Sequence, residues 1–248
     1  MELRGGIDVS YHQGMINWQA VKATGEVNFA ILRAGYGRYT YQKDPMFDRN
    51  YAGAKAAEIP VGAYWYSYAK SVEEAREEAK ACVEVLRRNK FEYPIYYDIE
   101  ANTQGGLGKA VVTAMCEAFC DTLEKSRYYA GVYANTFWFT HKLDHARLAA
   151  KYTIWLADYR RYYDKELVRH MHQYSAKGRV KGIPGRVDLD VCTLNFPVII
   201  KAAGLNGYSK PAAPDNTGLK TFTAQASPGD LSQLEKLAKS LNLSYKIE

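Results

Sequence analysis

The chain has 248 residues, of which 47% are apolar and 24% are charged, a composition typical of a globular protein rather than of a disordered or fibrous one. Its length allows one large hydrophobic core and a small additional module. The formal net charge is +6, but Lys and Arg form no concentrated block, and we expect no nucleic-acid partner. No apolar run is long enough to insert into a membrane.

Short apolar runs rich in β-branched and aromatic residues recur along the chain, and helical patterns separate most of them. The predicted strands cover residues 6–11, 29–36, 61–68, 93–100, 129–134, 153–158, 170–175 and 187–191. The predicted helices cover residues 18–24, 47–58, 72–89, 109–125 and 144–150. Ser71 and Glu74 have the spacing of a capping box at the start of the third helix.

Eight mostly parallel strands and about five helices predict an α/β fold, an incomplete (β/α)8 TIM-like barrel. The helical ring is expected to be incomplete because the last two strands are joined by Gly- and Lys-rich sequence without a helical period. An open, doubly wound sheet is the alternative. No Gly-rich phosphate-binding loop follows any strand, which favours the barrel.

The composition changes after residue 200, and we divide the chain there. Residues 201–218 are rich in Ala, Gly, Pro, Ser and Asn and are predicted to form a linker. Residues 219–248 predict a strand, a helix that begins near Ser227 and Pro228, and a second strand. This β-α-β module is too small to bury a core of its own. We therefore expect a barrel over residues 1–200, a linker, and a module that packs on the barrel, on a second copy, or within a larger module.

Neither the cysteines nor the N-terminal segment indicates an export route. The four cysteines form no Cys-x-x-Cys pair, and we interpret them as reduced thiols rather than as disulfides or zinc ligands. The N-terminal stretch MELRGGIDVS lacks the basic, apolar and cleavage regions of a signal peptide. We therefore expect synthesis in the cytoplasm, and a protein that acts outside the cell would need another exit route.

Acidic side chains occur near the ends of several predicted strands. Side chains at positions i and i+2 of a strand share a face, so Asp98 and Glu100 are expected to point the same way. In a barrel of this type, the carboxyl ends of the strands carry the chemistry. Asp8 lies in the first strand and Asp188 in the last, and closure of the barrel makes these strands neighbours. We therefore predict a cluster of four acids at one rim of the barrel.

Acids that cluster in a partly dry cleft cannot all ionise at low cost, so at least one pKa is expected to rise into the range of a general acid. A bound Mg²⁺ or Ca²⁺ is the alternative role for such a cluster. The five histidines lack metal-ligand spacing, and we expect neither a metal nor a cofactor. We interpret Asp190 as a turn or capping residue, and His170 and His172 as packing or rim residues.

Aromatic and polar residues of other strands point toward the same rim. The candidates for contact with a substrate are Tyr64, Tyr66, Tyr133, Trp155, Gln173 and Arg33. Tyrosine-rich clefts suit sugars, because the apolar face of a pyranose packs on an aromatic ring, although a stripe of tyrosines is also typical of a core or an interface. A buried Arg33 cannot stay unpaired, so we expect it to pair with an acid such as Asp8 or Asp188.

Several motifs follow one another over about residues 5–200, namely GIDVSYHQG, ILRAGYG, PVGAYWYSYA, PIYYDIE, GVYAN, IWLADY, HQYS and VDLDV. In this order they resemble glycoside hydrolase family 25, the lysozymes of phages, Gram-positive bacteria and some fungi. The resemblance implies a flattened, incomplete barrel and cleavage of the β-1,4 bond between N-acetylmuramic acid and N-acetylglucosamine. Motif by motif, it makes Glu100 the general acid and Asp98 its paired carboxylate, and it makes Asp8 and Asp188 the other acids of the cleft.

The residues are compatible with two chemical mechanisms for this cleavage and with two other functions. We expect Glu100 to protonate the leaving oxygen while Asp98 orients the 2-acetamido group of the substrate for attack on the anomeric carbon. Direct attack by water, assisted by Asp98 or Asp188, is the alternative. A non-catalytic wall-binding protein on the same barrel and a chitin-directed glycosidase are the alternative functions.

The resemblance also implies where the protein acts. The expected partner is the glycan strand of peptidoglycan in a Gram-positive cell wall, reached after release from the cytoplasm. Without a leader, a phage endolysin is favoured over a secreted autolysin. Residues 219–248 match no choline-binding or complete SH3-like repeat, and we expect them either to bind the wall or to form a homo-oligomer.

Overall fold

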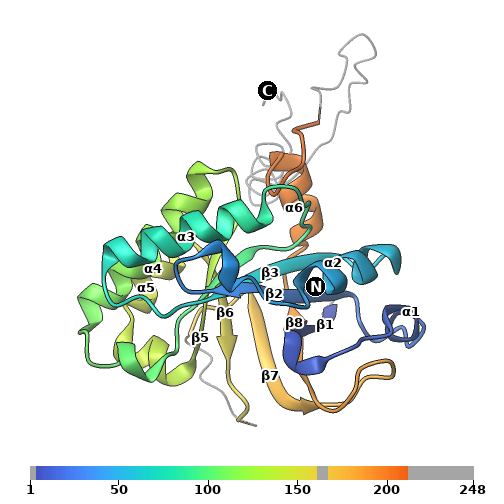
Figure 1. Ribbon diagram of the computed structural model, residues 1–248. Helices are drawn as coiled ribbons and strands as arrows, with labels where there is room; N and C mark the ends of the chain where they lie inside the picture. The colour runs from blue at the N-terminus through green and yellow to red at the C-terminus, as the bar shows by residue number, and fades with distance from the viewer. Residues whose placement is uncertain (1–3, 161–166, 212–248) are drawn as a thin grey trace, which may run out of the picture. The chain divides into compact units, whose positions relative to one another are not determined.

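The structure is a computed structural model that describes residues 4–160 and 167–211. The strands of these residues form one closed barrel in the order β1 to β8, shown in Figure 1. They are β1 (Arg4–Val9), β2 (Phe29–Tyr36), β3 (Val61–Tyr66), β4 (Ile95–Asp98), β5 (Ala130–Asn135), β6 (Thr153–Ala157), β7 (Met171–Gly178) and β8 (Val187–Cys192). Strands β1 to β7 pair in parallel, whereas β8 is antiparallel to both β7 and β1. The predicted barrel is confirmed, and closure of β8 on β1 shows that the open-sheet alternative is wrong.

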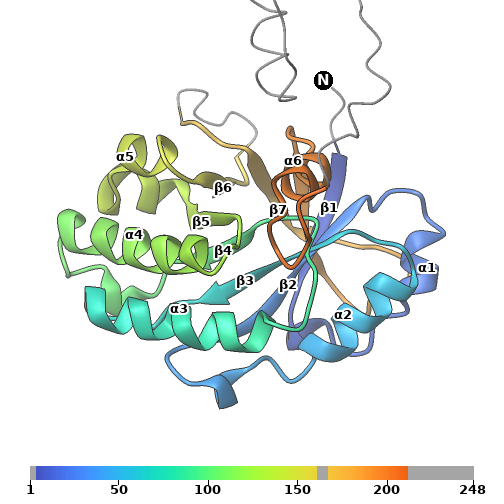
Figure 2. The ribbon, with the colours of Figure 1, turned by 90° about the horizontal axis from the view of Figure 1, so that it is seen from above.

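Helices cover only part of the barrel. The α-helices of the described residues are α1 (Trp18–Lys22), α2 (Phe47–Ala56), α3 (Val72–Leu86), α4 (Lys109–Lys125), α5 (His145–Ala149) and α6 (Phe196–Ala203). In Figure 2, α1 to α5 form an arc outside the sheet, and β7 lies away from this arc. No helix occurs between β7 and β8, so the incomplete helical ring predicted from the sequence is confirmed. Within the described residues, no helix combines the length and the apolarity needed to cross a bilayer.

Helix α3 forms for reasons that are visible in its sequence. Ser71 caps its start, because the serine hydroxyl accepts a hydrogen bond from Glu74 N at 3.2 Å. The Glu74 carboxylate turns back and accepts from Lys70 N at 2.7 Å. Two glutamates in the first turn also suit the positive end of the helix dipole. The face that packs inward carries Ala75, Glu78, Ala79, Ala81, Cys82 and Leu86.

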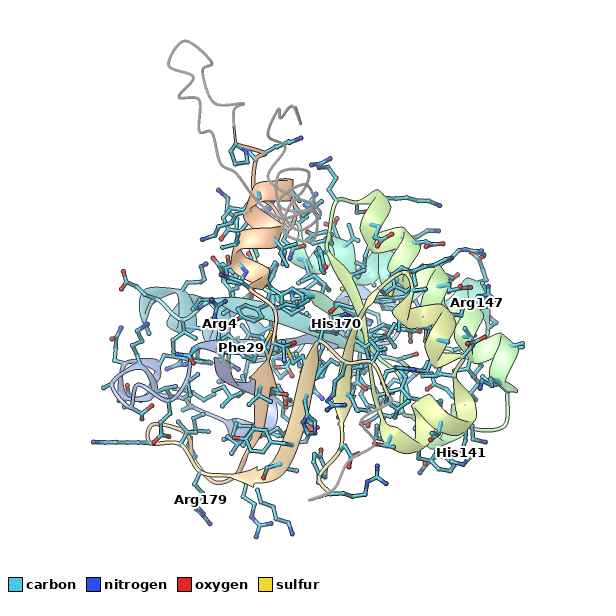
Figure 3. All side chains as sticks on the ribbon, turned by 180° about the vertical axis from the view of Figure 1, so that it is seen from behind. Arg4, Phe29, His141, Arg147, His170 and Arg179 are labelled. Carbon is cyan, nitrogen blue, oxygen red and sulfur yellow. The ribbon has the colours of Figure 1, made fainter. Side chains whose placement is uncertain are left out.

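Side chains that alternate along the strands create two hydrophobic clusters. The larger one lies outside the sheet, against the helices, and includes Trp65 and Phe119. The smaller one includes Phe29, Tyr96 and Trp155 and fills the barrel, where Figure 3 shows Phe29. All four cysteines are buried and free, in agreement with their interpretation as reduced thiols.

A glycine makes room for the ring of Phe29. A Cβ atom on Gly6 would lie 2.3 Å from Phe29 Cζ, so any side chain at this position of β1 would displace the ring. Glycine at this position therefore lets a large aromatic residue of β2 occupy the interior.

The barrel continues past the predicted boundary at residue 200. Helix α6 extends to Ala203, and Phe196 packs on Tyr93, with 5.8 Å between the ring centroids. Beyond the helix, Asn206 is buried; its side chain accepts from Tyr129 N at 2.7 Å and donates to Tyr93 O at 2.8 Å. The predicted linker therefore begins too early, because the compact unit ends at Pro211. The predicted module of residues 219–248 and most of the predicted linker lie outside the described residues.

Candidate active site

Asp8 and Asp188 face each other across the seam where the barrel closes. They are direct partners in the register between β1 and β8. Since β8 is antiparallel to its neighbours, Asp188 lies near the beginning of its strand but at the rim formed by the carboxyl ends of the other strands. The predicted approach of the two acids is confirmed. The sequence did not indicate that β8 runs in the opposite direction.

Asp98 and Glu100 reach the same rim from β4. Asp98 is the last residue of the strand and is buried, whereas Glu100 is half-buried in the loop that follows. Burial raises the pKa of Asp98 well above its usual range, and the charge of Glu100 raises it further. Burial also raises the pKa of Glu100, and the charge of Asp188 adds to this rise. These interactions join the acids into one electrostatic cluster.

Asp8 is held from β7 and lies near a fifth acid, Asp190. Gln173 Nε2 donates a hydrogen bond to Asp8 Oδ2 at 2.7 Å. Burial, followed by the charges of Asp190 and Asp188, raises the pKa of Asp8 well above its usual range. Asp190 accepts a hydrogen bond from Trp155 Nε1 at 2.8 Å, and burial raises its pKa to about 8. The interpretation of Asp190 as a turn or capping residue is wrong, because its side chain is fully buried in β8.

Two tyrosines orient Gln173. Its Oε1 accepts hydrogen bonds from Tyr133 OH at 3.0 Å and from Tyr159 OH at 2.6 Å. With Oε1 occupied in this way, Nε2 is the end that faces Asp8. Trp155, which we expected to contact substrate, is 1% exposed and packs on Tyr133, with 4.5 Å between the ring centroids. Gln173 and Trp155 therefore support the acids from beneath the cleft.

Arg33 projects from β2 but pairs with a residue that the sequence analysis missed. Its Nε donates to Asp44 Oδ2 at 2.7 Å, so Arg33 pairs with an acid as predicted, but this acid is neither Asp8 nor Asp188. Asp44 is buried in the loop between β2 and α2, where no periodic pattern distinguishes one acid from another. The charge of Arg33 still acts on the site, because it lowers the pKa of Asp98.

Tyr64 and Tyr66 lie beside the acids, as their positions on β3 predicted. Trp65, between them, packs into the outer hydrophobic cluster. Burial raises the pKa of Tyr64 well above its usual range, and the charges of Asp8 and Asp98 add to this effect. Burial also raises the pKa of Tyr66, and so do the neighbouring charges of Asp98 and Glu100.

A buried side chain anchors the loop that carries Glu100. Gln104 Oε1 accepts a hydrogen bond from Ala101 N at 3.2 Å, next to Glu100 in the chain. Its Nε2 donates to Ser67 Oγ at 2.8 Å and to Ala69 O at 2.9 Å. Gln104 therefore joins the loop after β4 to the segment after β3.

The hydrogen bonds continue from this loop into α3. Ser67 Oγ lies 2.7 Å from Tyr97 OH, which donates to Glu78 Oε2 at 2.6 Å. The other carboxylate oxygen of Glu78 accepts from Tyr68 N at 2.8 Å. Ser67, Glu78, Tyr97 and Gln104 are each fully buried, and we call them the Gln104 network. This network was not predicted from the sequence, because its members come from four separate segments.

Two cavities flank Glu100 at the rim. Cavity A, of about 550 Å³, lies over the ends of β1 to β3 and is lined by residues including Arg33, Tyr36, Tyr66 and Tyr68. Cavity B, of about 690 Å³, lies over the ends of β5 and β6 and is lined by residues including Glu100, Tyr133, Phe137, His141 and Tyr159. Because β4 lies between β3 and β5, a chain-like ligand that fills both cavities would pass the acid cluster.

The outer wall of cavity B contains residues that the sequence analysis did not single out. A π-helix over Trp138–Lys142 follows β5, and the His141 ring stacks on Phe137 with 4.7 Å between the centroids; Figure 3 labels His141. Asp158 bonds to Arg160 Nη2 at 2.6 Å, which lowers the pKa of Asp158 to about 2. Rings and a charged pair therefore border this cavity.

Similar proteins include enzymes of known class. Lysozyme M1 of Streptomyces globisporus is 31% identical over 198 residues, which cover 74% of this chain and 65% of that protein. The solved bacterial lysozyme of Streptomyces coelicolor is 27% identical with a TM-score of 0.68, covering 83% of this chain and 98% of that chain. The modular autolysin LytC of Streptococcus pneumoniae, solved in complex with a synthetic peptidoglycan ligand, is 26% identical with a TM-score of 0.69.

The chain is shorter than some of these relatives. It spans 65% of the length of Lysozyme M1, and the match with LytC covers 77% of this chain but 47% of that chain. The sequence profile described as "Glycosyl hydrolases family 25" matches residues 7–183. This match begins in β1, includes Asp8, Asp98 and Glu100, and ends before β8 and Asp188. The chain belongs to glycosyl hydrolases family 25.

Proposed function

We propose that the chain cleaves the β-1,4 bond between N-acetylmuramic acid and N-acetylglucosamine of peptidoglycan, with Glu100 as the general acid. The observation that carries this proposal is the place of Glu100, half-buried beside Asp98 and Asp188 and lining a cavity. Family membership and the similarity to Lysozyme M1 support the class of reaction. The peptidoglycan ligand of LytC supports the class of substrate.

Glu100 suits the role of acid better than its neighbours do. Asp8 and Asp98 also have raised pKa values, but both are buried below the cleft. Asp188 is half-buried and also has a raised pKa, but Glu100 lines cavity B. A general acid must reach the leaving oxygen and hold a proton near the working pH. Glu100 lines the cavity, and its raised pKa favours the protonated form.

Asp98 is suited to orient the substrate. Its Oδ1 is buried and makes no hydrogen bond within the described residues, and an unpaired buried acceptor of this kind is costly unless a ligand completes it. We propose that Asp98 Oδ1 accepts a hydrogen bond from the N–H of the 2-acetamido group of the substrate. The acetamido oxygen then attacks the anomeric carbon as Glu100 gives its proton to the departing oxygen, and water later opens the cyclic intermediate. This is a substrate-assisted route.

The rate of the Glu100→Gln variant tests the proposed function. Gln keeps the size of the side chain but cannot supply the proton, and we expect a loss of about 10²–10⁴-fold in the release of reducing ends from purified peptidoglycan. Glu124→Gln is the matched control, because Glu124 is an exposed residue of α4 outside the acid cluster. A Glu100→Gln variant with the wild-type rate would contradict the assignment.

Product stereochemistry distinguishes the two chemical routes. Attack by the acetamide retains the β configuration, whereas direct attack by water, assisted by Asp98 or Asp188, inverts it. Proton NMR during early turnover reports which anomer forms first. We expect the β anomer, and an initial α anomer would exclude the acetamide route.

The two rival functions predict different products. A non-catalytic wall-binding protein would sediment with purified walls without creating reducing ends. A chitin-directed glycosidase would cleave chitin oligomers, which lack the lactyl group of muramic acid. We expect turnover of peptidoglycan and little turnover of chitin oligomers.

We also propose that the protein acts outside the membrane on Gram-positive walls, in the manner of a phage endolysin. Such a protein must reach the glycan strands after it is made. The formal charge of +6 suits an anionic wall. Clearing of a panel of purified walls would test this proposal, with Gram-positive walls expected to clear and Gram-negative sacculi expected to clear more slowly.

A further inference from the structure

The loop between β2 and α2 builds a third cavity beyond cavity A. Cavity C, of about 520 Å³, is lined by residues including Tyr36, Arg38, Tyr39, Tyr68 and Lys70. Tyr36 and Tyr68 line both cavity A and cavity C, so the two cavities adjoin at these rings. Figure 2 shows the loop projecting beyond α3. Tyr66, whose pKa is raised in part by the charge of Glu100, lines cavity A but not cavity C.

Exposed tyrosines extend along this path. The ring centroids of Tyr66 and Tyr68 are 5.0 Å apart, and those of Tyr68 and Tyr36 are 5.9 Å apart. Farther along the loop, Tyr39 and Tyr41 stack with 5.2 Å between their centroids and 8° between their planes. Tyr39 is 49% exposed and Tyr41 is 80% exposed. Rings this exposed and adjacent mark a contact surface rather than a core.

The loop that presents the stacked pair is anchored at its N-terminal end, to β3 and to α3. Trp65 Nε1 donates to Gly37 O at 2.9 Å, and Gly37 N donates to Tyr66 O at 3.1 Å. Arg38 Nη1 lies 3.3 Å from Glu74 Oε1 and 3.2 Å from Glu77 Oε2, both on α3. The rings are therefore held in place before a ligand arrives, which lowers the entropic cost of binding.

We propose that Tyr36, Tyr39, Tyr41 and Tyr68 form a distal sugar-binding platform for the same glycan strand that is cleaved at Glu100. The inference rests on the proposed function. Sugar rings pack on exposed aromatic faces, and the platform is continuous with the cavity beside the acids through Tyr36, Tyr66 and Tyr68. A strand that runs along this path places additional sugars on the rings of the loop. The protein should therefore prefer long glycan chains to short ones.

The test compares the cleavage of peptide-free glycan chains of two lengths by the full chain. We expect the wild-type protein to show a higher kcat/KM on long chains than on tetrasaccharides. The double variant Tyr39→Ala, Tyr41→Ala should lose roughly tenfold in kcat/KM on long chains and keep the wild-type value on tetrasaccharides. Tyr41→Phe keeps the ring and should keep the preference for long chains.

Tyr174→Ala is the matched control, because Tyr174 is a 42% exposed tyrosine of β7 that lines none of the three cavities. It should retain the wild-type kcat/KM on both lengths. A double variant that matches the wild-type protein on long chains, or that loses equally on both lengths, would overturn the platform and leave the proposed function intact. If the wild-type protein cleaves neither length, the proposed function itself fails.

Discussion

Glu100 lies where its proton is retained to a higher pH than in a free glutamate. Burial raises its pKa, and the negative charge of Asp188 adds to the rise. In the same way, the charge of Glu100 contributes to the raised pKa of Asp98. The neighbouring carboxylates therefore tune the acid through space, and their effect on it can be measured separately from their contact with a substrate.

The Asp188→Asn variant measures this tuning. Asn removes the negative charge that favours protonated Glu100, so Glu100 will lose its proton at a lower pH. We expect the alkaline limb of the pH profile of kcat/KM to move to lower pH, whatever the change in the maximal rate. Asp48→Asn is the control, because Asp48 is exposed and pairs with Lys43. An alkaline limb that stays in place would contradict the coupling of Glu100 to Asp188.

The raised pKa of Asp190 makes the stability of the folded chain depend on pH. Its folded pKa is about 8, whereas an unfolded aspartate has a pKa of about 3.9. Between these values the folded chain holds a proton that the unfolded chain has lost. The stability contributed by the protonated group is therefore complete below about pH 4 and is lost as the pH rises toward 8.

The Asp190→Asn variant should remove this dependence. Asn does not titrate, and its Oδ1 can still accept the hydrogen bond that Trp155 Nε1 donates to Asp190. We expect the free energy of unfolding of the variant to fall less steeply between about pH 4 and pH 8, by up to about 1.4 kcal/mol per pH unit. Urea titrations across this range provide the measurement. Parallel pH dependences of variant and wild type would contradict a proton on Asp190.

The sequence predicted the main acids of the rim but not the residues that hold them. Asp98 and Glu100 lie at the end of a predicted buried strand, and strand alternation with barrel closure was enough to predict that they approach Asp8 and Asp188. Partners that come from loops have no such periodicity. Asp44 pairs with Arg33 from a loop, and a single sequence contains no sign of that contact.

At the scale of elements, the loop after β4 is positioned by the Gln104 network. Gln104 accepts a hydrogen bond from Ala101 N, next to Glu100 in the chain. Further hydrogen bonds join Gln104 through Ser67 and Tyr97 to Glu78 on α3. These buried groups are all hydrogen-bonded, and a satisfied buried network fixes one conformation of the segments that it joins. The position of Glu100 therefore depends on residues that line neither cavity A nor cavity B.

The Tyr97→Phe variant tests this positioning. It removes the hydroxyl between Ser67 and Glu78, and we expect kcat to fall about tenfold with little change in KM, because a displaced acid affects the chemical step. Tyr152→Phe is the matched control: it removes the hydroxyl of another buried tyrosine, bonded to Asp121 rather than to the network. If both variants keep the wild-type kcat, the network does not position Glu100.

The elements with strong periodicity were predicted best. Helix α4 has the predicted bounds Lys109–Lys125, and β2 has the predicted bounds Phe29–Tyr36. Helix α6 was missed because its sequence FPVIIKAA is a short apolar run, which is compatible with a strand as well as with a helix. Its helical state depends on tertiary packing, with Phe196 and Ile200 buried in the cluster inside the barrel.

At the scale of the molecule, α6 and the residues after it complete the barrel. We expect a chain that ends after Pro211 to fold, because the compact unit ends there. A chain that ends after Ile200 loses the end of α6 and the hydrogen bonds of Asn206 to Tyr129 N and Tyr93 O. We expect this shorter chain to be less stable by several kcal/mol. Thermal unfolding of the two chains, followed by circular dichroism, provides the comparison, and equal midpoints would contradict a structural role for residues 201–211.

The three cavities lie along one rim of the barrel, as the proposed cleavage of a polymer requires. Cavity B lies on one side of the acids, and cavities A and C lie on the other side. In a groove of this kind, the position of the acid along the bound chain determines which bond is cut. The sugar found at the new reducing end therefore shows which bond of the chain lies beside Glu100 during cleavage.

The most direct measurement is mass spectrometry of the fragments that the wild-type protein releases from purified peptidoglycan, after reduction of their new ends. Cleavage at the bond proposed for Glu100 leaves N-acetylmuramic acid at the reducing end, so every new fragment should carry N-acetylmuramitol. Fragments that end in N-acetylglucosaminitol, or walls that remain uncut by the folded protein, would contradict the account.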